Sequence, residues 1–395
     1  MRIQQITLRN FKAFQDVIMD DVPGFCVLVG ANGVGKSTFF DVFGFLRDCL
    51  VNNVRQALAK RGGFREVVSR GHTDENIVIE LKIRMTLEIG ERTVTYRIEV
   101  GDDGPGPVVA REVLQYTRFG GGKPYRFIDF ARGSGTAIVN ESEIGTSKPE
   151  ERREEQKLDS PDILAVKGLG QFQRFEAASQ FRSLIENWHV SDFHIQQARG
   201  VVDAGYAEHL SPSGDNLPLV AQHIYERHRP VFEKILQTLK RRVPGVSHAD
   251  ATETADGRIV LRFQDGSFKD PFISRYVSDG TIKMFAYLLL LYDPKSHPLL
   301  CVEEPENQLY PTLLQELAEE FHAYSQRGGQ VFVSTHSPDF LNAVPLDSII
   351  TIKKREGFSI LNRARSDANL RALVDAGDAP GWLWREGLFS DVDPR

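Results

Sequence analysis

A glycine-rich loop near the N-terminus has the residues needed to hold a triphosphate. Residues 30–37 read Gly-Ala-Asn-Gly-Val-Gly-Lys-Ser, which fits the pattern G-x-x-x-x-G-K-[ST] in full, between a strand-like apolar run and a helix-like run. Glycines let backbone N–H groups wrap phosphates, and a helix N-terminus adds its dipole. We expect Lys36 to reach the β- and γ-phosphate oxygens, Ser37 to bind Mg²⁺ and Thr38 to support the α-phosphate. The residues expected to bind nucleotide here are Gly30, Asn32, Gly33, Gly35, Lys36, Ser37 and Thr38.

Two carboxylates end a second apolar run. Residues 299–302, Leu-Leu-Cys-Val, are followed by Glu303 and Glu304. In an α/β sheet a phosphate ligand lies at the carboxyl ends of the strands. We predict that Glu303 holds Mg²⁺ through a water molecule, because glutamate is one methylene longer than the commoner aspartate. Glu304 then orients and polarises the attacking water as a general base. Beside the glycine-rich loop, the alternative of two merely exposed acids is weaker.

A single histidine follows the next apolar strand-like run. His336 stands in Ser-Thr-His, one helix and one strand after the two acids. A lone histidine is more often structural than catalytic. This placement nevertheless favours a hydrogen bond from His336 to the γ-phosphate, at the end of a strand that neighbours Glu304.

Composition and charge exclude several classes of protein. The chain has 395 residues, of which 41% are hydrophobic, so it can bury a large core. Its longest apolar run, residues 284–292, is too short to cross a bilayer, and the N-terminus lacks the apolar core of a signal peptide. We expect a cytoplasmic protein without a membrane partner. A net charge of −6 argues against a protein that is coated in nucleic acid through its overall charge, but a local basic patch could still bind phosphates. The cysteines Cys26, Cys49 and Cys301 lack metal-ligand spacing.

The remaining pattern divides the chain into three regions. Apolar and polar residues alternate in three runs between residues 77 and 116, which predicts an antiparallel sheet. Residues 133–159 are polar and charged, so we expect a solvated loop or a short surface helix. Helical spacing at 173–188 and 217–242 suggests a lateral helical subdomain, and later helix–strand alternation predicts a parallel sheet. The predicted fold is α/β, with an N-terminal lobe at 1–132, an insertion at 133–245 and a C-terminal lobe at 246–395.

Together these motifs resemble the heads of ABC-class P-loop ATPases of the RecF, SMC and OLD kind. The glycine-rich loop corresponds to Walker A, and Glu-Glu-Pro-Glu-Asn at 303–307 with Ser-Thr-His at 334–336 completes the resemblance. The opening residues 6–14, Ile-Thr-Leu-Arg-Asn-Phe-Lys-Ala-Phe, are similar to the first strand and turn of those heads. That segment helps to hold the nucleotide in the family, so the resemblance implies contacts from Asn10 and Lys12.

A further stretch, residues 276–281, resembles a variant of the family's signature motif. It reads Tyr-Val-Ser-Asp-Gly-Thr, and a serine and a glycine at a helix N-terminus form an anion site suited to a γ-phosphate. In the family that phosphate belongs to the opposite protomer. The resemblance thus implies a homodimer that closes two ATP molecules with Mg²⁺ between its heads. The signature residues contributed in trans are Ser278, Asp279, Gly280 and Thr281.

Residues 303–311 also cover the family's Walker B motif and D-loop. This alignment places Asn307 and Leu309 in the D-loop, while Tyr310 replaces a more usual acid or histidine. The spacing of the motifs does not identify the glutamine that would form the family's Q-loop. The insertion is too short for the coiled-coil arms of SMC proteins, and the chain looks most like the compact, SMC-related "predicted ATPase" group often found in bacterial antiviral systems.

Four functions are compatible with this resemblance. We favour a regulatory ATPase of genome or antiviral defence that controls a separately encoded effector. A transporter motor ranks last, because the chain has no spanning segment, and an OLD-like nuclease would need more than the terminal acids Asp391 and Asp393. A RecF-like repair ATPase that binds DNA directly is the main alternative. It would need a basic stripe, for which the candidates are Arg61, Arg65, Arg70, Lys240, Arg241 and Arg242.

Overall fold

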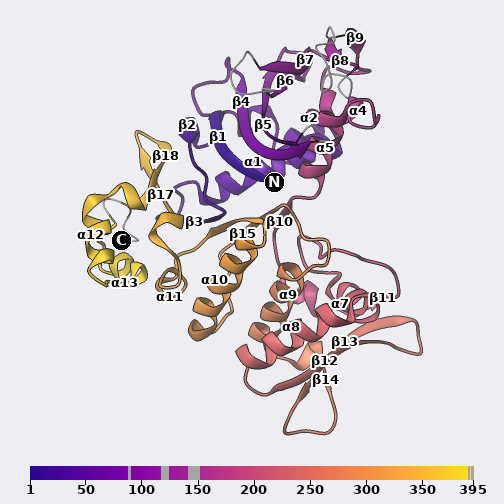
Figure 1. The fold of residues 1–395 in the computed structure, drawn as a ribbon, viewed down its shortest axis with the longest axis vertical. Helices are drawn as coiled ribbons and strands as arrows, with labels where there is room; N and C mark the ends of the chain where they lie inside the picture. The colour runs from indigo at the N-terminus through magenta and orange to yellow at the C-terminus, as the bar shows by residue number, and fades with distance from the viewer. Residues whose placement is uncertain (88–89, 117–123, 141–151, 390–391, 393–395) are drawn as a thin grey trace.

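An antiparallel sheet of eight strands forms the N-terminal end of the molecule (Figure 1). The computed structural model describes all residues except 88–89, 117–123, 141–151, 390–391 and 393–395. Strand order is β2-β1-β4-β5-β6-β7-β8-β9. The strands are β1 (Arg2–Phe11), β2 (Phe14–Met19), β4 (Ile77–Leu87), β5 (Gly90–Asp102), β6 (Pro107–Tyr116), β7 (Tyr125–Ala131), β8 (Ser134–Ile138) and β9 (Arg153–Lys157).

The sheet continues beyond the region that the sequence predicts. Residues 134–138 and 153–157 are strands β8 and β9, so the prediction of a solvated loop or surface helix is wrong for these residues. The residues between them that belong to 141–151 lie outside the described part of the chain. Strand β9 reads Arg-Glu-Glu-Gln-Lys and forms the sheet edge, where charged side chains protect unpaired backbone groups. This edge role explains why its composition resembles that of a loop.

A six-stranded sheet forms the centre of the molecule, in the order β10-β15-β16-β3-β17-β18. Every pair from β10 to β17 is parallel, and β18 pairs with β17 in antiparallel fashion. Strands β3 and β16 are buried at every residue, as expected of a parallel sheet covered on both faces. The strands are β3 (Phe25–Val29), β10 (His189–Ser191), β15 (Leu299–Glu303), β16 (Gln330–Ser334), β17 (Ile349–Arg355) and β18 (Phe358–Arg363).

Two hydrophobic cores lie on the two faces of this central sheet. Cys26 and Leu28 of β3 face a core shared with the eight-stranded sheet and with α1, whereas Val27 and Val29 face a core shared with α9 and α10. The first core also includes α2, α4 and α5. The helices are α1 (Lys36–Val51), α2 (Val54–Ala59), α3 (Phe64–Val67), α4 (Ala165–Leu169), α5 (Glu176–Glu186), α9 (Asp279–Leu291) and α10 (Pro311–Gln326).

The helical stretches predicted at 173–188 and 217–242 lie in different cores. Helix α5 packs in the first core, whereas α7 and α8 pack in the second, at the end of the molecule opposite the large sheet (Figure 1). Residues 217–242 form two helices because Pro230, in the first turn of α8, cannot continue the hydrogen bonds of α7. The remaining elements here are α6 (Ile195–Ala198), β11 (Val202–Asp203), α7 (Leu217–Arg227), α8 (Arg229–Arg242), β12 (Val246–Glu253), β13 (Arg258–Asp265) and β14 (Phe272–Ile273).

The C-terminal elements lie beside the outer strands β17 and β18 (Figure 1). They are α11 (Pro338–Leu341), α12 (Ala368–Asp375) and α13 (Pro380–Arg385). Among the helices of the described residues, none has the length and apolar character needed to cross a membrane.

Candidate functional site

The glycine-rich loop joins β3 to α1 in a conformation that requires glycine at two positions. Gly33 and Gly35 have φ values of 73° and 109°, a region that other residues rarely adopt. A Cβ atom on Gly35 would lie 2.6 Å from Oγ of Ser359 in β18. The ammonium group of Lys36 donates to the carbonyl oxygens of Gly30 and Ala31, at 2.9 Å in each case. The loop is therefore held in shape by its own lysine and by the neighbouring hairpin.

A cavity opens above this loop. Its lining includes Asn32, Gly33 and residues 35–38 of the loop, together with Lys12 and Glu304. Lys12 reaches it from the turn after β1, where its ammonium also pairs with Asp41 at 2.6 Å. The hairpin between β17 and β18 contributes Lys354, Glu356, Gly357 and Phe358, which the motifs alone did not point to.

Asn10 and Gly30, also expected to bind nucleotide, do not line the cavity. Asn10 is 6% exposed, and its amide donates to Glu75 at 2.8 Å and to the carbonyl of Asn76. Gly30 lies behind the loop, where an added Cβ would come within 2.4 Å of the Ile352 carbonyl oxygen. Lys12 therefore lines the cavity, whereas Asn10 and Gly30 do not.

Two acids face the loop from the end of β15. Glu303 accepts a hydrogen bond from Ser37, the residue that follows Lys36. Burial raises the pKa of Glu303, and this hydrogen bond partly opposes the rise. A hydroxyl and a carboxylate in contact are hard oxygen donors of the kind that Mg²⁺ prefers. Ser37 and Glu303 therefore lie where they could share one Mg²⁺ shell.

Glu304 is held by contacts with three residues. Its φ of 42° turns the backbone sharply after the strand, and its backbone N–H donates to the Ser334 carbonyl at 3.0 Å. Asn307 donates to one carboxylate oxygen at 3.1 Å, while Nε2 of His336 lies 3.5 Å from the other. The structure thus brings the predicted base, the predicted histidine and the D-loop asparagine together.

Glu306 fixes the position of His336. Its carboxylate accepts a hydrogen bond from the backbone N–H of His336 at 2.6 Å and from the hydroxyl of Thr335 at 2.9 Å. Burial lowers the pKa of His336, with the charge of Lys36 acting in the same direction. The imidazole is accordingly neutral at pH 7, so it can donate a hydrogen bond without adding charge.

A buried lysine near these acids was missed by the sequence motifs. Lys283 in α9 is 5% exposed, and its ammonium donates to the carbonyl oxygen of Asn307 at 2.6 Å. Burial lowers its pKa to about 8, opposed by the charges of Glu306 and Glu304. Its signal in the sequence is a single charge inside the apolar run that follows the signature residues.

The signature residues form the N-terminus of α9, in a different cleft. Ser278 caps this helix by accepting a hydrogen bond from the N–H of Thr281 at 3.3 Å, and Asp279 pairs with Arg199 at 2.5 Å. Ser278, Gly280 and Thr281 line a cleft with Leu309 and Tyr310, whose ring is 72% exposed. Among the described residues, those that line the cavity above the glycine-rich loop do not include any signature residue.

Comparison with solved structures identifies the fold. The chain is similar to an SMC head bound to the C-terminal winged-helix domain of ScpA, with a TM-score of 0.57 and 16% identity over 92% of this chain and 98% of that one. It is also similar to an SMC head with an extended coiled coil bound to the C-terminal domain of ScpA from Pyrococcus furiosus. That match has a TM-score of 0.52 and 15% identity over 94% of this chain and 99% of that one.

Comparison with protein families identifies the relatives. A search of curated protein sequences found no match. Residues 25–342, which include the glycine-rich loop, both acids, the signature residues and His336, match the family AAA_21, described as "AAA domain, putative AbiEii toxin, Type IV TA system". Since the match covers most of the chain and the fold is that of an SMC head, the protein belongs to this family of P-loop ATPases.

Proposed function

We propose that the protein is a Mg²⁺-dependent ATPase that forms a homodimer, in which the two heads close on two ATP molecules. The observation that carries the proposal is the separation of its two phosphate sites. Lys36, Ser37, Glu303 and Glu304 meet at the glycine-rich loop, while Ser278 and Gly280 line another cleft of the same chain. A second protomer can supply the missing half of each site.

Each residue then has a defined part in hydrolysis. The loop N–H groups and Lys36 bind the phosphates, and Mg²⁺ held by Ser37 and Glu303 would neutralise charge on the β- and γ-phosphates. Glu304 accepts a proton from the water that attacks the γ-phosphorus, and the bond to the ADP oxygen breaks. His336 donates a hydrogen bond to a γ-phosphate oxygen, where negative charge must be stabilised.

A mixing experiment tests the composite site. Lys36→Ala removes nucleotide binding in its own head, and Ser278→Arg places a bulky side chain at the N-terminus of α9. Each variant alone should be inactive. When they are mixed, one of the two sites of the heterodimer combines an intact loop with an intact signature serine, so activity should return to about a quarter of wild type if the protomers exchange freely.

The control is a mixture of Lys36→Ala with the double variant Lys36→Ala/Ser278→Arg, which cannot assemble an intact site. Activity that stays absent in the first mixture, although sedimentation shows heterodimers, would mean that Ser278 acts in its own head. If Ser278→Arg alone hydrolyses ATP, the signature residues have no part in the mechanism.

The biological role that we infer is the control of a separately encoded effector in a defence or toxin–antitoxin system. The family's description names a toxin–antitoxin system, and the related SMC heads are bound to ScpA, a separate protein. Copurification from the native host, with Glu304→Gln and ATP to hold the closed form, tests this role.

Direct DNA binding is the second candidate and receives less support. Three of the six cations of the expected stripe are already paired with carboxylates. Arg61 lies 2.6 Å from Asp41, Arg70 lies 2.6 Å from Glu66, and Arg242 lies 3.1 Å from Glu316. These pairs weaken the positive potential that phosphates would meet. Recovery of DNA without any protein partner in the copurification would reverse this order.

A further inference from the structure

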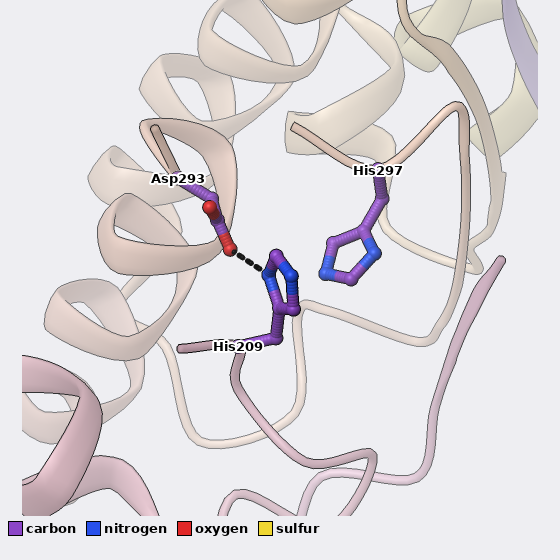
Figure 2. A group of neighbouring side chains, drawn as sticks. All are labelled: His209, Asp293 and His297. Carbon is purple, nitrogen blue, oxygen red and sulfur yellow. Dashed lines mark hydrogen bonds and ion pairs between the residues drawn. The ribbon is translucent and has the colours of Figure 1, made fainter. Parts of the chain in front are cut away.

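Two histidines and an aspartate meet near the start of β15, at the opposite end of this strand from Glu303. His209 follows β11, Asp293 follows the end of α9, and His297 precedes β15 (Figure 2). One ring nitrogen of each histidine and one carboxylate oxygen all lie within 4.8 Å of one another. Two segments therefore converge on one point, namely the connection between α9 and β15 and the segment after β11.

The cluster has the outer contacts that orient metal ligands. Nδ1 of His297 lies 2.9 Å from the carbonyl oxygen of Asn187, so it carries the proton and leaves Nε2 as a lone-pair donor. Oδ1 of Asp293 accepts a hydrogen bond from the backbone N–H of Lys295 at 2.8 Å. Its other oxygen, Oδ2, lies 2.7 Å from Nδ1 of His209.

One ring nitrogen in the cluster has no hydrogen-bond partner. His297 is only 7% exposed, yet its Nε2 is buried and makes no hydrogen bond to another described residue. Its ring lies beside that of His209 (Figure 2), with the ring centres 5.0 Å apart and the ring planes tilted by 52°. A buried nitrogen without a partner carries a free-energy cost that a bound cation would remove.

We propose that His209, Asp293 and His297 bind a divalent transition-metal ion, with Zn²⁺ as the best fit. Imidazole nitrogens and a carboxylate oxygen form a common zinc ligand set, with bonds of about 2.0–2.2 Å. Ligand atoms of a tetrahedral site stand about 3.3 Å apart. His209 and Asp293, now 2.7 Å apart, would separate by about half an ångström, and ligand atoms that lie up to 4.8 Å apart would approach by up to about 1.5 Å. Three protein ligands leave a fourth position for water.

An ion can reach this site from solvent. His209 lines a surface cleft together with Lys295, Ser296 and Pro298, and its side chain is 31% exposed. The bound ion would fasten the end of α9 to the start of β15 and to the segment after β11. It would thus join the helix that begins with the signature residues to strand β15, which ends at Glu303.

Metal binding is measured on tag-free protein that has been stripped with a chelator and contains no nucleotide. Zn²⁺ is titrated in competition with a chromophoric chelator, and Co²⁺ serves as a spectroscopic probe of the ligand set. We expect one Zn²⁺ per chain. Loss of an outer contact typically weakens metal binding 10- to 100-fold, and loss of a ligand weakens it more. His297→Gln and His209→Asn should therefore each lose at least about 100-fold in affinity.

Two control variants separate this site from others. His223 and His228 form another histidine pair, with ring centres 5.5 Å apart, outside the cluster, so His223→Gln should bind zinc like wild type. Glu303→Gln should also bind it, which excludes the nucleotide site as the source. Equal affinity in His209→Asn, His297→Gln and wild type would overturn the proposal, and so would wild-type protein that takes up no zinc. If His297→Gln fails to fold, the more exposed His209→Asn decides.

Discussion

Replacing Lys283 by methionine should stabilise the protein although it removes a hydrogen bond. Lys283 is 5% exposed, and burial lowers its pKa from 10.5 to about 8. At about 1.4 kcal/mol for each pH unit, a charged Lys283 at pH 7 therefore costs about 3 kcal/mol of folding free energy. Methionine has a similar length and no charge, so it recovers this cost. The loss of the hydrogen bond to the carbonyl of exposed Asn307 costs about 1–2 kcal/mol, so the net gain in stability is about 1–2 kcal/mol.

The pH dependence of this gain follows from the direction of the shift. A base whose pKa is lower in the folded state is penalised while it is charged. The penalty is complete below the folded pKa of about 8 and disappears as the pH rises to the unfolded value of 10.5. The advantage of methionine at position 283 should therefore be constant between pH 6 and pH 7 and smaller by about 1 kcal/mol at pH 9.

Chemical denaturation at pH 7 and pH 9 measures this difference, with Lys283→Arg as the control. Arginine keeps its charge at both pH values, so it should not show the gain. Hydrolysis should respond in the opposite sense, because the Lys283 ammonium positions the D-loop carbonyl next to Glu304. We expect kcat of Lys283→Met to fall at least about tenfold with little change in KM for ATP. A loss of stability at pH 7, or an equal gain at both pH values, would refute the reasoning.

Two further variants probe the base and the large sheet. Glu304→Gln keeps the shape of the side chain and its contact with Asn307, but it cannot accept a proton. We therefore expect ATP binding to persist, the closed dimer to accumulate and hydrolysis to fall by about 10²–10⁴-fold. A phosphate-release rate equal to that of wild type would show that another group is the base. Glu112 is fully buried, and burial raises its pKa from 4.5 to about 7 despite a hydrogen bond from Tyr96 at 2.9 Å. An acid whose pKa is raised in the folded state stabilises the fold below pH 4.5 and loses that contribution as the pH rises through 7. Glu112→Gln should therefore raise the thermal unfolding midpoint by roughly 2–4 °C more at pH 8 than at pH 5. Identical changes in the midpoint at the two pH values would contradict the raised pKa of Glu112.

Local sequence was sufficient for the parts of the site that are contiguous in the chain. The glycine-rich loop, the acids at the end of β15 and the fold class followed from a strand, a short motif and a helix in succession, since parallel strands present their carboxyl ends at one edge. His336 could be placed beside Glu304 for the same reason, because β15 and β16 are neighbours. Strand alternation could not separate Asn10, which is buried, from Lys12, which reaches the cavity, because residues two apart share one face of a strand. The difference arises because the chain leaves β1 after Phe11 and turns.

Contacts between distant segments could not be predicted in this way. Lys283 appeared as one charge in an apolar helix, and only the tertiary fold shows that its ammonium reaches Asn307. His209 and Asp293 are 84 positions apart, in irregular segments without a periodicity that would place them together. The edge strand β9 carries the composition of a loop because its solvent-facing position demands charge. In each case long-range packing, rather than local preference, decides the outcome.

Helix α9 connects the proposed sites in a way that bears on mechanism. Ser278 caps its N-terminus, Lys283 contacts the D-loop from its second turn, and Asp293 follows its C-terminus. From Thr281 to Leu291 every residue is buried, so the helix is packed on all sides and should move as a rigid body. Docking of a partner's γ-phosphate on Ser278 would then displace Asp293 as well. A metal ion that fastens Asp293 to the start of β15 would oppose any such displacement relative to this strand, which Glu304 follows directly. Zinc should therefore change the rate of head closure in wild type, and it should leave the rate unchanged in His209→Asn.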